Sequence, residues 1–168
     1  MRELAARLRV AAGPNAGSMP NILVLHGPNL GALGTREPSV YGQVTLPEID
    51  RRLREFAPSL GCAVECRQSN HEGVLIDALY ASQPGVDAFL VNPGALGHTS
   101  VALRDALAAI GRPAVEVHLS NPASREPFRH GSLISTVVLG VVQGFGAHSY
   151  LLGLRALATH LGDSPHRA

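Results

Sequence analysis

Residues 22–29, ILVLHGPN, are the most informative segment of the chain for its fold class, since four consecutive apolar residues lead directly into a Gly-Pro turn. A continuous apolar run, rather than an alternating one, is typical of a parallel strand that is covered on both faces. Similar short runs recur along the chain. They predict further strands at residues 63–67, 87–91, 115–119 and 137–142.

Helical patterns separate these runs. The first begins at Thr45, where Thr45 and Glu48 form a capping box, and continues to about Leu60. Further helices are expected at residues 72–81, 100–110 and 148–160. Strands regularly separated by helices indicate right-handed crossovers and a parallel sheet. We therefore predict an α/β fold: a flavodoxin-like, doubly wound, five-stranded parallel sheet in three layers.

The length of 168 residues suits one domain. We expect residues 1–18 to be an N-terminal extension that is disordered or weakly helical, and residues 19–168 to form a single catalytic domain. The extension has three arginines and no uninterrupted apolar run, which argues against a secretory signal. The expected location is the cytoplasm.

The composition excludes several classes of partner. A net charge of +1, with 4% aromatic residues and no Trp, gives no basic surface for nucleic acid or for an anionic membrane. No apolar run is long enough to span a bilayer. Cys62 and Cys66 would lie about 13 Å apart on a strand, too far for a disulfide. There is no second cysteine pair for zinc, and His26 and the other remaining histidines show no metal-ligand spacing with acidic partners. We expect no metal and no cofactor.

Polar residues follow the strands at the places where strands end. In an open parallel sheet, ligands bind beyond the carboxyl ends of the strands, so these groups are candidates for one site. The long loop at residues 27–44 belongs to the same edge, and its length suggests a lid. The candidates are His26, Asn29, Arg36, Tyr41, Asn92, His98, Glu116, His118 and Ser120.

Glu116 and His118 are the first candidate pair. Positions i and i+2 of a strand share a face, so the carboxylate can reach the imidazole. A carboxylate on one ring nitrogen fixes the tautomer and supports general acid or base catalysis. The alternative is a core histidine satisfied by its neighbour; the position at the end of a strand favours function.

Arg36 and Tyr41 are the second pair. A nearby guanidinium stabilises a phenolate and so lowers the pKa of tyrosine, which would make a base without a metal. Taken alone, the pair is weak, since such loop residues usually pack or face solvent.

Other candidates have equally plain structural interpretations. His98 precedes a helix whose free N–H groups could hold a carboxylate, or Thr99 or Ser100 could cap that helix. Asp105 could form a surface ion pair with the neighbouring Arg104. Arg125 and Arg129 could bind an anion or be solvated, and Asn29 and Asn92 could be turn formers. The glycine spacing fits neither a dinucleotide fingerprint nor a P-loop, and no G-x-S-x-G elbow occurs.

Taken together, the motifs resemble those of the type II 3-dehydroquinate dehydratases over residues 22–161. The segments that carry the resemblance are LHGPNL (25–30), GTREP (34–38), YG (41–42), QSNHEG (68–73), NPG (92–94), HTSVALRD (98–105), EVHLSN (116–121) and REPFRH (125–130). Several ordered motifs at consistent spacing are far more specific than any one of them.

The resemblance implies a cofactor-free dehydration of 3-dehydroquinate to 3-dehydroshikimate by anti elimination through an enolate. It also implies a flavodoxin-like subunit in a homododecamer built from trimers. Tyr41 would be the base, Arg36 would keep it ionised, and Asn29 would orient a water or hydrogen bond near the enolate oxygen. His118, oriented by Glu116, would protonate the leaving hydroxyl. The substrate would be held by Asn92, His98, Arg129, the Leu119 and Ser120 backbone N–H groups, and Asp105 of a neighbouring subunit.

Three departures from the family pattern stand near these residues. His26 replaces a more usual Asn, Gly31-Ala32 a more usual Asn-Leu, and Gly97 a more usual Thr. We expect His26, at the start of the loop behind Asn29, to affect lid geometry or substrate affinity. Two alternatives remain: a non-catalytic ligand-binding or assembly module derived from this family, and a flavin- or nucleotide-binding domain, which the scarcity of aromatic residues disfavours.

Overall fold

The computed structural model describes residues 19–35 and 43–163, which contain a five-stranded, fully parallel sheet with the strand order β2-β1-β3-β4-β5. This is the predicted doubly wound, flavodoxin-like arrangement. The order reverses at β1, so the switch point lies between β1 and β3. The strands are β1 (Asn21–His26), β2 (Ala63–Gln68), β3 (Ala88–Asn92), β4 (Ala114–His118) and β5 (Gly140–Gln143).

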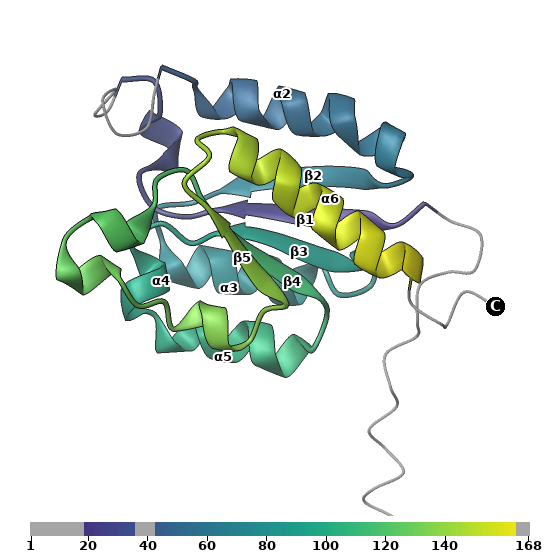
Figure 1. Cartoon of the computed structure of the whole chain (residues 1–168). Helices are drawn as coiled ribbons and strands as arrows, with labels where there is room; N and C mark the ends of the chain where they lie inside the picture. Colours follow the sequence, from purple (N-terminus) through teal and green to yellow (C-terminus); the bar gives the residue numbers. More distant parts are fainter. Residues whose placement is uncertain (1–18, 36–42, 164–168) are drawn as a thin grey trace, which may run out of the picture.

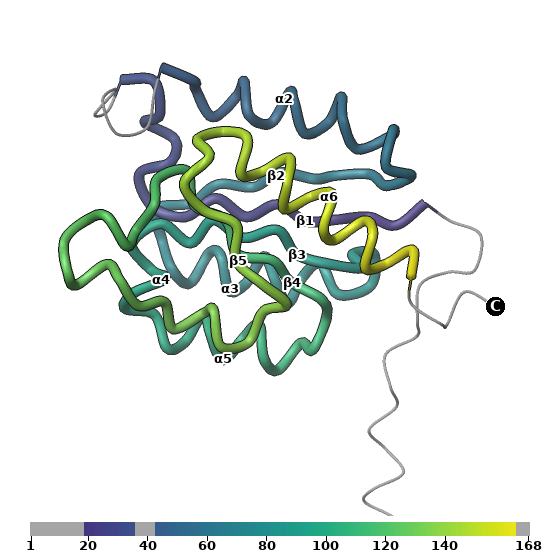
Figure 2. Tube along the Cα trace, in the orientation of Figure 1, coloured from purple at the N-terminus to yellow at the C-terminus, as the bar shows by residue number. Residues whose placement is uncertain are grey.

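Helices cover both faces of the sheet and complete the three layers (Figures 1 and 2). On one face lie α2 (Leu46–Phe56) and α6 (His148–Asp163); on the other lie α3 (Glu72–Ala81) and α5 (Val101–Ile110), with the short α4 (Leu96–Thr99) beside them. Alternate residues of the three central strands, β1, β3 and β4, pack in the two core layers. In β1, for example, Val24 packs in the cluster with α2 and α6, and Leu25 in the cluster with α3 and α5.

The helix boundaries follow from local chemistry. The Thr45 hydroxyl accepts a hydrogen bond from the Glu48 N–H, as the capping box predicts, and the Ser100 hydroxyl accepts one from the Leu103 N–H at 2.8 Å. Helix α5 ends at Gly111, whose φ of 67° is in the left-handed region. Ser100 thus acts as a cap, one of the two roles considered for it.

Several boundaries differ from the sequence-based predictions, among them the end of α6, which lies at Asp163 and not at His160. The helix predicted to run from Thr45 to Leu60 ends at Phe56 and continues as a 3-10 helix, Ala57–Leu60, which contains Pro58. A separate helix, α4, precedes α5, because Ser100 is extended between them. The fifth strand starts at Gly140 rather than Val137, because a 3-10 helix, Ile134–Thr136, occupies the preceding turn.

The loops after β1 and β3 cross at very short range. The Gly27 N–H donates to the Asn92 carbonyl at 2.8 Å, and a Cβ at Gly27 would lie 2.2 Å from the Pro93 carbonyl oxygen. Only glycine fits this crossing. The close packing holds Asn29 and Asn92, at the ends of neighbouring strands, beside a common pocket. Among the described residues, no helix is both long and apolar enough to cross a membrane.

Candidate active site

A pocket of about 170 Å³ lies beyond the carboxyl ends of the strands, where the sheet topology predicts a ligand site. It brings together seven of the candidate residues: Asn29, Asn92, His98, His118, Leu119, Ser120 and Arg129. Arg125 also lines it, so two arginines and two histidines face a pocket of small-molecule size. The environment suits an anionic, polyhydroxylated ligand.

His118 is bound to a buried carboxylate. Its Nε2 lies 2.6 Å from Glu116 Oε1, and the Glu116 side chain is completely buried. An ionised carboxylate can only accept, so His118 donates through Nε2. The Nδ1 atom makes no hydrogen bond to any residue in the described ranges. The ring is therefore oriented from behind and has one nitrogen available at the pocket, as proton transfer requires.

His98 is held in a complementary way. Its Nδ1 lies 2.7 Å from the Gly131 carbonyl oxygen, and a carbonyl can only accept. In the neutral ring, Nε2 is therefore an acceptor, suited to a ligand hydroxyl. The His98 and His118 rings lie nearly parallel, 6.4 Å apart between centroids and 13° apart in plane.

Asn29 occupies a left-handed conformation with φ of 67°, the only described non-glycine residue at positive φ. Its backbone N–H donates to Asn70 Oδ1 at 2.9 Å, and Gln68 Nε2 donates to the same oxygen at 3.0 Å and to the Gly27 carbonyl at 3.3 Å. These contacts from β2 and the loop after it thus hold Asn29 in its strained backbone conformation beside the pocket. The QSNHEG motif had no assigned role in the sequence analysis; its position beside the first strand end could have suggested one.

Asn92 is buried at the end of β3. Its Oδ1 accepts from the Gly94 N–H at 3.2 Å, whereas Nδ2 makes no hydrogen bond within the described part of the chain. A buried, unsatisfied N–H at the wall of a pocket is costly unless a ligand accepts from it. Asn92 lines the pocket, and its amide also lies close to the buried Tyr150 hydroxyl.

The remaining candidates lie elsewhere. Arg36 and Tyr41 fall outside the described residues. Asp105 does not line the pocket; it is exposed on α5 and pairs with Arg104 at 2.8 Å. Arg129, which does line the pocket, also pairs with Glu126 at 2.9 Å.

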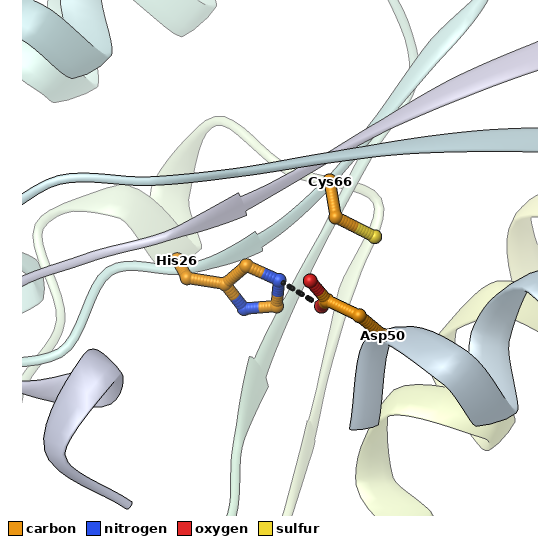
Figure 3. Close-up of side chains that lie close together, drawn as sticks. All are labelled: His26, Asp50 and Cys66. Atoms are coloured by element: carbon orange, nitrogen blue, oxygen red, sulfur yellow. Dashed lines mark hydrogen bonds and ion pairs between the residues drawn. The ribbon is translucent and has the colours of Figure 1, made fainter. Parts of the chain in front are cut away.

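His26 differs most from its prediction. The sequence suggested no acidic partner and a position at the start of the lid loop, but His26 is the last residue of β1 and is completely buried. Its Nε2 lies 2.9 Å from Asp50 Oδ1, and its Nδ1 lies 2.8 Å from the Tyr150 hydroxyl (Figure 3 shows the Asp50 contact). The residue fastens β1 to α2 and α6 and does not line the pocket. Tyr150 packs as predicted, whereas Tyr80, also expected to pack, is half exposed.

His26, Asp50 and Cys66 offer ligand atoms within 4.8 Å of one another, the one such cluster in the described ranges (Figure 3). The groups do not favour a metal ion. Both His26 nitrogens are already hydrogen-bonded, and the Arg54 guanidinium lies 3.7 Å from Asp50. Burial, reinforced by the charge of Asp50, raises the pKa of the Cys66 thiol to about 12, so the thiolate that a metal needs is disfavoured. We interpret the cluster as a hydrogen-bonded structural unit.

Comparisons with known proteins identify the family. The family model described as "Dehydroquinase class II" matches residues 20–158. The chain belongs to this family. Within it, a 3-dehydroquinate dehydratase of Acaryochloris marina is 56% identical over 144 residues, covering 86% of this chain and 97% of that protein.

Crystal structures of other class II dehydroquinases have the same fold. The type II dehydroquinase from Butyrivibrio crossotus superimposes with a TM-score of 0.82 at 41% identity, covering 84% of this chain and 99% of that one. The type II dehydroquinase from Propionibacterium acnes gives 0.79 at 40% identity, covering 84% and 98%.

Proposed function

We propose that this class II dehydroquinase is a hydro-lyase that converts 3-dehydroquinate to 3-dehydroshikimate, by anti elimination through an enolate. The observation that carries the proposal is the buried Glu116–His118 pair, which presents one imidazole nitrogen to a pocket lined by Arg125 and Arg129. The reaction serves either the shikimate pathway, which leads to aromatic amino acids, or quinate breakdown.

The first step is removal of the proton next to the ketone. We assign it to Tyr41, with Arg36 keeping the phenolate ionised and helping to stabilise the developing negative charge. The electron pair of the broken C–H bond moves to the ketone oxygen and forms the enolate. Asn29, beside the pocket, would orient a water or hydrogen bond toward that oxygen.

The second step is departure of the hydroxyl group. Because the Nε2 proton of His118 is committed to Glu116, the ring must be an imidazolium to donate from Nδ1. The buried Glu116 carboxylate stabilises that cation. When the enolate collapses, the C–O bond breaks and the hydroxyl leaves as water with the Nδ1 proton. Neither step needs a metal or a cofactor.

Substrate orientation falls to the rest of the pocket. Asn92, His98 and Arg129 would hold the hydroxyl groups, and the Leu119 and Ser120 backbone N–H groups would receive the carboxylate. Asp105 would act at the site of a neighbouring subunit, which accords with its exposed place on α5 outside its own pocket. We further propose that the chain forms a homododecamer built from trimers and is located in the cytoplasm.

The test is ultraviolet absorbance after purified protein is mixed with 3-dehydroquinate in the presence of a chelator, because the conjugated product absorbs where the substrate does not. We expect a rise that the chelator leaves unchanged and that Tyr41→Phe nearly abolishes. Absence of a rise from folded, assembled wild-type protein would contradict the proposal and favour a ligand-binding relative. A Tyr41→Phe variant at near-normal rate would remove the role given to Tyr41.

A further inference from the structure

The turn at residues 131–134 contacts His98 directly and contacts Glu116, the partner of His118; we call this turn the histidine clasp. The Gly131 carbonyl accepts the His98 Nδ1–H at 2.7 Å. The next residue, Ser132, has its hydroxyl oxygen 2.7 Å from Glu116 Oε1, the same atom that accepts from His118. Neither Gly131 nor Ser132 lines the pocket, and Ser132 has been given no role so far.

The Ser132 hydroxyl has a defined direction. Its oxygen accepts from the Ile134 N–H at 3.2 Å, and its proton can go to Glu116 Oε1 at 2.7 Å or to the Gly97 carbonyl at 3.4 Å. The shorter bond to a charged acceptor is much the stronger. The clasp itself is fixed to α4 by the Leu133 N–H, which donates to the Gly97 carbonyl at 2.8 Å, and by the fully buried Ile134.

Glu116 has few other ways to be satisfied. Oε2 makes no hydrogen bond within the described ranges, so Oε1 carries both contacts, from Ser132 and from His118. An ionised carboxylate that is completely buried is costly unless donors compensate it. Ser132 donates throughout the proton cycle of His118, and it fixes the carboxylate oxygen against which the imidazole is aligned.

We propose that Ser132 is a positioning residue for the proton donor: it holds Glu116 ionised and in place, and through it sets the orientation and charge of His118. This rests on the proposed dehydration, in which His118 protonates the leaving hydroxyl. Ser132 acts through Glu116 and does not touch the substrate.

The variant Ser132→Ala tests the proposal. Loss of a hydrogen bond to a charged group is expected to lower kcat about tenfold. KM should change less than about twofold, because Ser132 is outside the pocket. Without the serine donor, Glu116 holds the imidazolium proton more tightly, so the limb of the pH–kcat profile that belongs to this pair should move to higher pH, by about half a unit or more. Ser132→Thr, which keeps the hydroxyl, should restore most of kcat and the profile.

Ser135→Ala is the matched control. Its hydroxyl donates to the Ser132 carbonyl at 2.8 Å and is exposed, so it supports the same turn without reaching Glu116. We expect wild-type kcat and pH profile from it. If Ser135→Ala lowers kcat as much as Ser132→Ala, a general loosening of the turn explains the effect and the proposal is wrong.

A second measurement does not depend on turnover. In ¹⁵N NMR spectra, the His118 ring in wild-type protein should show a protonated Nε2 and a titration that shifts to higher pH in Ser132→Ala. Should Ser132→Ala not fold, Ser132→Cys keeps the shape with a weak donor and should show the same changes. An unchanged profile and unchanged spectra in these variants would overturn the inference while wild-type turnover persists. Absence of wild-type turnover, in contrast, would overturn the proposed function itself.

Discussion

Two histidine–carboxylate pairs, each with a buried histidine, lie on opposite faces of the same sheet. His26 ends β1 and meets Asp50 at 2.9 Å on the face covered by α2 and α6; His118 ends β4 and meets Glu116 at 2.6 Å on the face with α3 and α5. In both pairs the carboxylate binds Nε2. In each pair the histidine is the last residue of its strand and its partner is a carboxylate, so the two pairs look equivalent.

The difference lies in the second nitrogen. Nδ1 of His26 is 2.8 Å from the buried hydroxyl of Tyr150, whereas Nδ1 of His118 is at the pocket without a partner among the described residues. Burial raises the pKa of the Tyr150 phenol well above its ordinary value, so the phenol stays protonated and can donate to His26. A histidine capped at both nitrogens stabilises structure, and one capped at a single nitrogen can transfer a proton.

The largest expected effect that separates the pairs is on kcat. Glu116→Gln removes the charge that stabilises the His118 imidazolium, and we expect kcat to fall about a hundredfold or more, in line with general acid catalysis. The matched variant is Asp50→Asn, which changes the carboxylate of the other pair and should keep kcat within about threefold. Equal losses in steady-state assays of the two variants would mean that both pairs serve catalysis.

Next in size is an effect on stability. Tyr150→Phe leaves His26 Nδ1 buried without a donor and should lower the free energy of unfolding by about 1–3 kcal/mol. Urea denaturation measures this, with Tyr80→Phe as the control, since Tyr80 is half exposed and its loss of a hydroxyl should cost less than about 0.5 kcal/mol. We expect Tyr150→Phe to retain kcat. A large fall in kcat with unchanged stability would place Tyr150 in the catalytic machinery.

The smallest expected effect is on the pH dependence of stability. Burial raises the pKa of Asp50, but the hydrogen bonds from His26 and Cys66 and the charge of Arg54 outweigh it, so the pKa lies below its ordinary value of 3.8. A lowered pKa contributes stability that is present above the unfolded value, about 4, and is lost as pH falls through the folded value. The stability advantage of wild type over Asp50→Asn should therefore shrink between pH 5 and pH 3. An advantage that grows over this range would contradict the assignment.

Much of the fold was accessible from the sequence, because apolar runs and caps specify strands and helices locally. Strands β1 to β4 were placed within one residue. The fifth was not: Val137 and Val138 extend the apolar run, but they pack against the α3–α5 core layer before the strand begins at Gly140. Apolar character marks burial and leaves the backbone conformation open.

Part of the site could also be predicted from the sequence, because the ends of the strands can be located from local patterns. Seven candidate residues meet at one pocket, since parallel strands end at one edge. Partners from distant elements were missed. Asp50 and Tyr150 are 24 and 124 positions away from His26, which they contact, and Ser132 is 16 positions away from Glu116. Neither spacing nor periodicity connects such positions. His26 was expected at the start of the lid loop for this reason, although its partners lie on α2 and α6.

The most direct test compares one substitution at both histidines, His118→Asn and His26→Asn, by kcat on 3-dehydroquinate and by thermal denaturation. The difference in Nδ1 environment predicts that His118→Asn lowers kcat at least a hundredfold, although loss of the donor to the buried Glu116 also lowers the melting temperature. His26→Asn should lower the melting temperature by several degrees and leave kcat within about threefold. A His118→Asn enzyme that turns over normally would contradict the catalytic role of His118. A loss of kcat in His26→Asn as large as in His118→Asn would contradict the structural role of His26.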